Sequence, residues 1–348
     1  MTAAVTGERG EELRVRADEL LATARAQVGP RLRELVENRL AAVAAEARYH
    51  LGWRDEQGRP VARGGGKAVR PALCLAAAAA VGGSAERAEA PAVAVQLVHE
   101  FSLLHDDIVD GDRTRRGRPS VWAAFGVSSG LLCGDVLLAL AFESLAESRT
   151  GALGLGELAR TAVELGEGEA EDVAFERRPR AAPQEYAAMA AAKTGALMRC
   201  ACLLGASAGG AEEERARELG AFGRHLGVAF QIADDLLGVF GDPRVTGKPV
   251  GSDLAARKKS LPVVAALCAD GEAAQELADL FDHAGALGPT EVEHAAALVE
   301  RAGGARVARR EVTHRLALAH SALARALPAP AARRDLLALA HLLTHRDR

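Results

Sequence analysis

Three aspartates end an apolar run in the segment LLHDDIVDGDRTRRG, residues 103–117. If residues 91–110 form one helix, Asp106 and Asp110 share a face, with Asp107 at its edge. Carboxylates crowded at the C-terminal end of a helix repel one another and oppose the helix dipole, so a cation is needed to offset their cost. Hard divalent ions such as Mg²⁺ bind such oxygens together with water or phosphate. On its own, the cluster could equally be a solvated acidic helix end.

A second acidic pair, Asp234 and Asp235, has the same layout in the segment FQIADDLLGVFGDPRVTGKPVGSDL, residues 230–254. An apolar helical pattern precedes the pair, and a polar turn with lysines follows it. Two acidic helix ends facing each other across a cleft could hold several Mg²⁺ ions that clamp a diphosphate. The repetition of this layout in separate parts of the chain therefore favours a metal and diphosphate site over a solvated surface.

Helices are expected to position both segments. Hydrophobic residues make up 49% of the 348-residue chain and aromatic residues only 3%, so Ala, Leu and Val dominate, which favours helix over sheet. Neither an alternating strand pattern nor an internal repeat is found. Helical patterns, interrupted at Gly and Pro, lie near 14–27, 30–50, 68–81, 88–110, 118–147, 154–177, 183–207, 212–240, 260–269, 272–285, 290–303, 305–326 and 330–346. We predict a disordered tail over 1–12 and one all-α domain over 13–348.

The overall charge and the cysteines argue against several classes of protein. The net charge of −4 provides no general field for nucleic acid or an anionic membrane. The five cysteines form no C-x-x-C pair and no disulfide-like pattern, which indicates a reducing compartment. The N-terminus becomes acidic before any apolar core, so no secretory signal is expected. The apolar stretches are too short, or interrupted by Asp135, so we expect a cytoplasmic protein without stable membrane insertion.

The two aspartate segments resemble the two aspartate-rich motifs of the trans-isoprenyl diphosphate synthases, the polyprenyl synthetase family. Further elements match that family in order and spacing, namely GGKAVRP at 65–71, RRG at 115–117, KTGALM at 193–198 and GKPVGSDL at 247–254. The resemblance covers roughly residues 30–270 and is strongest to short-chain bacterial geranylgeranyl and farnesyl diphosphate synthases. It implies a single-domain isoprenoid-synthase-type helical bundle around a deep central cavity, and a homodimer.

The resemblance also assigns roles to residues at matching positions. It implies that three Mg²⁺ ions are held by Asp106, Asp110 and Asp234, with Asp107, Asp172 and Asp235 in support. It implies an allylic diphosphate site of Arg115, Lys193, Gln231, Lys248 and Lys258. It implies a metal-free pocket for isopentenyl diphosphate made by Lys67, Arg70, His99 and Arg116, where the planar fork of arginine suits phosphate oxygens. The residues expected to carry catalysis are Asp106, Asp107, Asp110, Arg115, Lys193, Asp234 and Lys248.

The implied reaction is the Mg²⁺-dependent head-to-tail condensation of isopentenyl diphosphate with an allylic diphosphate of C5–C15. Metals and cations stabilise the leaving diphosphate, and an allylic carbocation forms. The double bond of isopentenyl diphosphate attacks this cation, and a proton is then lost. Such catalysis depends on electrostatic stabilisation and positioning in a dry cavity. The resemblance thus implies a prenyltransferase of isoprenoid biosynthesis.

Side chains just before Asp106 predict the product length, because the allylic tail should run from Asp106 back along its own helix. Ser102 is small and leaves room on the same stripe, whereas Phe101 is bulky and rotated aside. In the resembled family, one aromatic residue at this place suits C20 geranylgeranyl diphosphate best. C15 farnesyl diphosphate and longer polyprenyl products stay open as alternatives.

The chain departs from the family pattern at several positions near the expected site. Ala68 and Val69 stand where a basic residue is often found next to the lysine. Gly238 stands where the second motif usually has a third aspartate, and Asp242, one turn later, could substitute in part. Glu169 stands where a glutamine is usual. The departures at Gly238 and Glu169 leave open a catalytically weak partner subunit. A class I terpene cyclase is a further alternative, although it would lack both the isopentenyl diphosphate pocket and the second aspartate pair.

Overall fold

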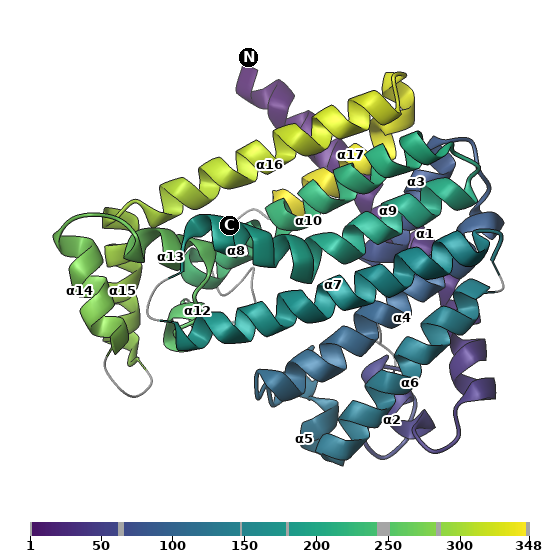
Figure 1. Ribbon diagram of the computed structural model, residues 1–348, viewed down its shortest axis with the longest axis horizontal. Coiled ribbons are helices and arrows are strands. Elements are labelled where there is room, and N and C mark those ends of the chain that lie inside the picture. The colour runs from purple at the N-terminus through teal and green to yellow at the C-terminus, as the bar shows by residue number, and fades with distance from the viewer. Residues whose placement is uncertain are drawn as a thin grey trace. The chain divides into compact units, whose positions relative to one another are not determined.

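Helices form nearly all of the computed structural model (Figure 1), which describes residues 2–61, 66–146, 148–178, 181–241, 251–282 and 287–345. The first helices are α1 (Thr2–Arg39), α2 (Ala44–His50), α3 (Val69–Ala80), α4 (Ala85–Val109), α5 (Val121–Phe125), α6 (Val127–Ala146) and α7 (Gly151–Arg177). They are followed by α8 (Pro183–Ala190), α9 (Ala196–Ala208), α10 (Glu213–Phe240), α12 (Ser252–Ala255), α13 (Leu261–Leu267), α14 (Glu272–Asp282), α15 (Pro289–Arg301), α16 (Gly304–Ala326) and α17 (Pro330–Thr344). The predicted all-α fold class is confirmed.

The chain divides into two compact units, each built from several segments. The first unit contains Met1–Ala162, Cys200–Gly220 and Arg325–Leu339, and the second contains Val163–Arg199, Ala221–Ala324 and Ala340–Arg348. The single domain proposed for residues 13–348 stays a prediction. Helix α1 begins at Thr2, so the segment 1–12, predicted as a disordered tail, is helical from that residue onward. Its alanine, glutamate and arginine residues are good helix formers, which allows the helix to continue.

Three helical patterns are interrupted where the sequence predicted continuous helices. The pattern 30–50 breaks over residues 40–43, between α1 and α2. The pattern 118–147 breaks at Gly126, whose φ of 93° lies in the region that favours glycine. The pattern 183–207 contains a π-helical turn over Ala191–Gly195, between α8 and α9. A π turn inside a run of α-helix often marks a functional site, and this one carries Lys193.

Helix α4 packs against α6, α3 and α1 in the first unit. Its residues 91–98 are all buried, so this part of the helix is surrounded by the core on every side. Gly205 allows α9 to approach α3 closely, because a Cβ at that position would overlap the carbonyl group of Cys74. This packing fixes the helix whose C-terminal end carries the first aspartate segment.

A short β-hairpin follows α4 and was not predicted from the sequence. Its strands β1 (Thr114–Arg115) and β2 (Arg118–Pro119) are antiparallel, with Thr114 opposite Pro119. The two loop residues, Arg116 and Gly117, have φ angles of 54° and 74°, as in a type I′ turn. Strands of two residues are too short to leave an alternating pattern, which explains the omission.

The second unit has two apolar cores, and α13, which packs against α8, α14 and α15, contributes to both. One core includes the buried residues Phe175, Tyr186, Ile232 and Val264. The other includes Val239, Leu254, Leu277 and Leu298. Since Ile232 and Val239 lie on either side of the second aspartate pair in α10, the two cores fix that pair in place.

Among the residues that the structure describes, two helical runs meet the length and hydropathy criteria for crossing a membrane. They are Val127–Ala146, of mean hydropathy 1.6, and Pro183–Ala208, of mean hydropathy 1.3. From the sequence, the first run is not expected to cross a membrane, because Asp135 interrupts it. The buried share of the most apolar window is 44% in the first run and 72% in the second, and core helices of soluble proteins meet the same criteria. Membrane insertion is therefore not indicated by these runs alone.

Candidate active site

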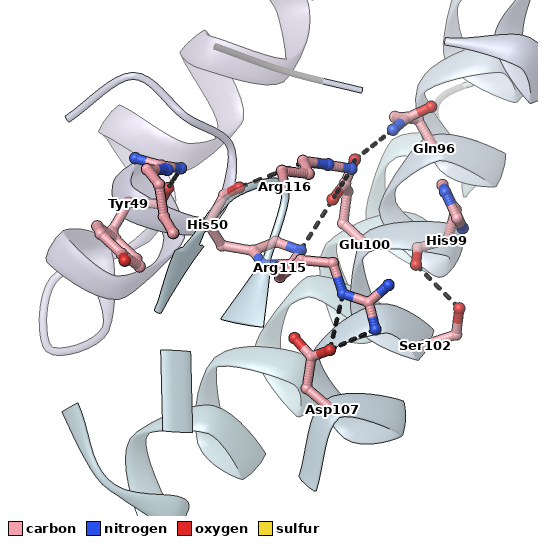
Figure 2. Close-up of polar contacts among 10 residues, drawn as sticks. Tyr49, His50, Gln96, His99, Glu100, Ser102, Asp107, Arg115 and Arg116 are labelled. Atoms are coloured by element: carbon pink, nitrogen blue, oxygen red, sulfur yellow. Dashed lines mark hydrogen bonds and ion pairs between the residues drawn. The ribbon is translucent and has the colours of Figure 1, made fainter. Parts of the chain in front are cut away.

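The three aspartates at the end of α4 differ in their surroundings. Asp106 is half-buried and Asp110, at the C-cap, is exposed, whereas Asp107 is 1% exposed. Arg115 of the hairpin donates from Nε to Asp107 Oδ1 at 2.7 Å, and its Nη2 contacts the same oxygen (Figure 2). Burial raises the pKa of Asp107, and the Arg115 ion pair partly offsets that rise. Asp107 therefore anchors the hairpin to α4, while Asp106 and Asp110 face more open surroundings.

Arg116, the next hairpin residue, contacts a second buried carboxylate. Its Nη2 lies 3.2 Å from both carboxylate oxygens of Glu100, and its Nη1 donates to the backbone oxygen of His50 at 3.4 Å (Figure 2). Glu100 was not among the predicted site residues. The only signal in the sequence is a carboxylate inside the apolar run before Asp106, directly after His99.

Arg70 and His99 each have a buried nitrogen that lacks a hydrogen-bond partner in the part of the chain that the structure describes. These atoms are Arg70 Nε and His99 Nδ1. Burial lowers the pKa of Arg70 to about 10, although the charges of Glu100 and Asp106 oppose this. Burial and the nearby Arg70 charge lower the pKa of His99 well below its usual value, so its ring is neutral at pH 7. Lys67 is an exposed residue of the loop that precedes α3.

The second aspartate pair lies in α10 and, like the first pair, has one buried and one more exposed member. Asp234 is exposed, whereas Asp235 is 3% exposed. Tyr186 donates its hydroxyl to Asp235 Oδ2, the backbone N–H of Leu261 donates to the same atom at 3.2 Å, and Gln231 donates to Oδ1 at 3.1 Å. Burial raises the pKa of Asp235 to about 6 despite these donors. Asp235 therefore ties α10 to α8 and α13.

Lys193 lies between two carboxylates of α7. Its Nζ donates to Asp172 Oδ2 at 2.7 Å and lies 2.7 Å from Glu169 Oε2. The sequence prediction brought Lys193 and Asp172 to the same site, and the structure places them in direct contact. Glu169, the residue that departs from the family pattern, adds a second negative charge to the same lysine. A Cβ on Gly168 would overlap the backbone nitrogen of Lys193, so glycine permits this close approach.

Lys258 and Lys248 are the two other lysines predicted for the allylic site. Lys258 is half-buried; burial lowers its pKa, but the charges of Asp172, Asp253 and Asp235 outweigh burial and raise it. Lys248 lies outside the described residues. Gln231, predicted for the same site, also accepts a hydrogen bond from Thr194 at 2.7 Å.

The place of the missing third aspartate in the second motif is taken by another carboxylate. A Cβ on Gly238 would overlap the carboxylate of Asp253 and would lie 2.8 Å from its Oδ1. Asp253 belongs to the GKPVGSDL element and lies in the first turn of α12. Asp242, which was considered as a substitute, lies outside the described residues.

The two predicted chain-length residues make local contacts within α4. Ser102 is buried and donates its hydroxyl to the backbone oxygen of His99 at 2.9 Å. Phe101 is half-buried and packs edge-on against His105, with ring centroids 4.7 Å apart. Their effect on product length stays a prediction.

No cluster of three metal-ligating side chains is found within the described residues. Such a cluster is not required for Mg²⁺, which commonly binds through one or two carboxylates, with water and substrate phosphates completing its shell. The carboxylates of Asp106, Asp110 and Asp234 are hard oxygen donors of the required kind. The donor set is therefore chemically suited to Mg²⁺.

Comparisons with known proteins show which family this chain resembles. A family model described as polyprenyl synthetase matches residues 53–299. The chain is 45% identical to a geranylgeranyl diphosphate synthase of Mycobacterium tuberculosis over 331 residues, which cover 94% of this chain and 93% of the relative. Farnesyl diphosphate synthases from mycobacteria are 44% identical over 303 residues, with 84% of each chain covered.

Solved structures show the same fold. The crystal structure of a polyprenyl synthetase from Streptomyces coelicolor A3(2) has a TM-score of 0.89 at 42% identity and covers 93% of this chain and 98% of its own. A geranylgeranyl pyrophosphate synthase from Corynebacterium glutamicum, complexed with isoprenyl diphosphate and magnesium, has a TM-score of 0.78 at 27% identity and covers 95% and 99%. The predicted family, and the predicted synthesis of short-chain trans-prenyl diphosphates by a prenyltransferase, are confirmed. The chain thus belongs to the polyprenyl synthetase family, a family of Mg²⁺-dependent prenyltransferases.

Proposed function

We propose that this prenyltransferase condenses isopentenyl diphosphate head to tail with an allylic diphosphate of C5–C15, and that geranylgeranyl diphosphate is its main product. The observation that carries the proposal is the pair of buried nitrogens, Arg70 Nε and His99 Nδ1, without partners in the described chain. A buried donor without a partner costs free energy, and a bound ligand is one way in which that cost is removed. A diphosphate oxygen suits both atoms.

The isopentenyl diphosphate pocket would be formed by Lys67, Arg70, His99 and Arg116. In this proposal Arg70 and Arg116 grip phosphate oxygens through their planar guanidinium groups. The neutral ring of His99 adds a hydrogen bond from Nδ1, in the tautomer that carries the proton there, without adding charge. Because Glu100 already offsets part of the cationic charge, the pocket can remain folded before substrate binds.

The allylic diphosphate would be bound by the cations Arg115, Lys193, Lys248 and Lys258, with Gln231, and by Mg²⁺. Asp106, Asp110 and Asp234 would hold the metal, three ions in all, with Asp107, Asp172 and Asp235 supporting these ligands and cations. When bound, Mg²⁺ supplies Lewis-acid stabilisation of the leaving diphosphate. The contacts of Lys193 with Asp172 and of Arg115 with Asp107 hold those two cations in place before the substrate arrives.

The chain's own residues would act mainly by orientation and exclusion of water. The pocket cations fix the double bond of isopentenyl diphosphate next to the allylic carbon, and the alanine- and leucine-rich helices keep water from the carbocation. We propose that the released diphosphate takes the proton, so that no side chain has to act as a general base. Ser102 leaves room for the growing tail and Phe101 limits it, which favours C20; C15 stays the alternative.

The oligomeric state, the cellular location and the extent of the domain are proposed as well. We propose a homodimer that is soluble in the cytoplasm and binds neither nucleic acid nor the membrane interior. The large buried fraction of the apolar run Pro183–Ala208 supports its role as a core helix. We further propose that residues 13–348 act as one isoprenyl diphosphate synthase domain.

The test is to incubate the purified protein with Mg²⁺, labelled isopentenyl diphosphate and each of the C5, C10 and C15 allylic diphosphates, and then to size the products. We expect a C20 product; failure to elongate any primer would refute the proposed function. Asp106→Ala should lower activity by orders of magnitude and should also abolish the Mg²⁺-dependent rise in melting temperature that inorganic pyrophosphate produces. Phe101→Ala should lengthen the product, and an unchanged length would place the floor elsewhere.

A further inference from the structure

Glu100 lies at the centre of a buried polar cluster in the first unit (Figure 2). Its side chain is 1% exposed and lies 2.8 Å from Nε2 of His50, whose side chain is 2% exposed. Gln96, one turn earlier in α4, donates to Glu100 Oε1 at 2.5 Å. Arg116 provides the third contact, with Nη2 3.2 Å from both carboxylate oxygens. A carboxylate this deeply buried is kept only where specific partners compensate for its lost hydration.

These partners keep Glu100 charged. Burial alone would raise the pKa of its carboxyl group, but the contact with His50 and the charges of Arg116 and His50 outweigh burial and lower it. Glu100 is therefore ionised at pH 7. The side chain of Arg116 is 26% exposed, whereas that of Glu100 is 1% exposed. One side of the guanidinium group therefore contacts the buried carboxylate, while the other remains accessible to solvent.

The backbone of Arg116 is held in an unfavourable conformation. Its φ of 54° lies in the left-handed region, which side chains other than those of Gly, Asn and Asp rarely adopt. A two-residue type I′ loop favours Asn or Gly at this position. Strain of this kind persists only where surrounding contacts determine it, and it is common at ligand-binding sites. The contacts of Arg116 with Glu100 and with the backbone oxygen of His50 are such determinants.

A third segment also contacts this guanidinium group. A Cβ on Gly66 would lie 2.9 Å from Arg116 Nη2, so the loop before α3 comes close to this guanidinium group at a residue without a side chain. Lys67, another proposed ligand of isopentenyl diphosphate, follows directly in that loop. The Glu100 cluster thus fixes Arg116 relative to α2, α4 and the loop that carries Lys67.

We propose that Glu100 is a positioning residue that holds Arg116 in the geometry needed to bind the diphosphate of isopentenyl diphosphate. The inference rests on the proposed role of Arg116 in that pocket. It makes Glu100 responsible for affinity toward one of the two substrates, although Glu100 carries the same charge sign as the diphosphate. His50 and Gln96 act through Glu100 by fixing its carboxylate.

The sign of one kinetic effect separates this role from a simple countercharge. If Glu100 only adds negative charge near the pocket, Glu100→Gln lowers the KM for isopentenyl diphosphate because repulsion is removed. If Glu100 positions Arg116, the same isosteric change raises that KM by about tenfold, because the guanidinium group loses its charge-assisted tether. The KM for the allylic substrate and kcat should then change by less than about twofold, because the loss is confined to one binding site.

The experiment measures KM for each substrate separately, together with the melting temperature, for wild type, Glu100→Gln and Arg116→Gln. Glu164→Gln is the matched control, because Glu164 also pairs with arginines, Arg224 at 2.5 Å and Arg199 at 3.6 Å, but in the second unit. It should leave the KM for isopentenyl diphosphate unchanged. If Glu100→Gln does not fold, Gln96→Leu, which removes only the neutral donor to Glu100, should still raise the same KM by a smaller factor.

The outcomes separate this inference from the proposed function. A raised KM for isopentenyl diphosphate in both Arg116→Gln and Glu100→Gln supports the positioning role. A raised KM in Arg116→Gln alone, or a lowered KM in Glu100→Gln, refutes the role of Glu100 and leaves the pocket intact. If neither variant changes the KM of an active enzyme, the assignment of Arg116 to the pocket is wrong, and the inference is wrong with it.

Discussion

Glu169→Gln should strengthen the binding of the allylic diphosphate. Lys193, one of the cations proposed for that diphosphate, lies 2.7 Å from the carboxylates of both Asp172 and Glu169. One lysine between two carboxylates leaves a local excess of negative charge, which repels an incoming phosphate. Replacing Glu169 by glutamine, the residue usual in the resembled family, keeps the side-chain shape and removes one of these charges.

The size of the effect follows from these contacts. A phosphate oxygen bound to Lys193 at about 2.8 Å would lie within about 5.5 Å of the Glu169 carboxylate, given the 2.7 Å ion pair. At an effective dielectric constant of about 20, two unit charges at that distance repel by about 3 kcal/mol. Because the two side chains are 18% and 15% exposed, solvent screening reduces this to about 1–2 kcal/mol. The KM for the allylic substrate should therefore fall by about 5- to 30-fold.

The assay is steady-state kinetics with the allylic diphosphate varied at saturating isopentenyl diphosphate. Glu171→Gln is the control, because Glu171 lies on the same helix but pairs with Arg178 at 2.9 Å. It removes the same charge without touching Lys193, so its KM should stay near that of wild type. An allylic KM that stays unchanged or rises in Glu169→Gln would contradict the argument, since a rise would mean that Glu169 orients Lys193 rather than weakening it.

Three further changes test separate contacts. Arg70→Leu should raise the KM for isopentenyl diphosphate by about 100-fold or more. It should also raise the melting temperature, because a half-buried cation is removed whose buried Nε lacks a partner in the described chain. A lower melting temperature would mean that Arg70 is paired. Tyr186→Phe should lower the free energy of unfolding by about 2 kcal/mol, measured by denaturant titration, because the buried carboxylate of Asp235 loses a donor. Gly238→Asp should destabilise the protein by about 1–3 kcal/mol, because the new side chain overlaps the Asp253 carboxylate; the added change Asp253→Gly should restore the melting temperature.

The sequence predicted the fold class and the motif helices because those depend on short-range patterns. The apolar run before Asp106 gave the position of α4, and the second run gave α10. The contact of Glu100 with His50 and Arg116 could not be predicted, because it joins residues 50 and 16 positions apart in the chain. Nothing in single-sequence spacing encodes such a pairing.

The hairpin and the role of Gly238 illustrate the same limit. A two-residue strand leaves no period, so the RRG segment was read as a pair of cations and not as a turn in the left-handed region. Gly238 was read as a missing carboxylate, because the motif was compared position by position. The structure places Asp253 against that glycine, and this depends on how the chain folds back after α10.

Each adjacent aspartate pair contains one buried and one more exposed carboxylate. Neighbouring residues on a helix point about 100° apart, so one of each pair faces the core when the other faces outward. Asp107 and Asp235 are the inward members, 1% and 3% exposed, and each is bound by donors from other elements. Asp106 and Asp234, the outward members, are more exposed. The inward carboxylate fixes the helix end by hydrogen bonds, and this fixes the direction in which its neighbour projects. A change at the inward position should therefore impair metal binding without removing a metal ligand.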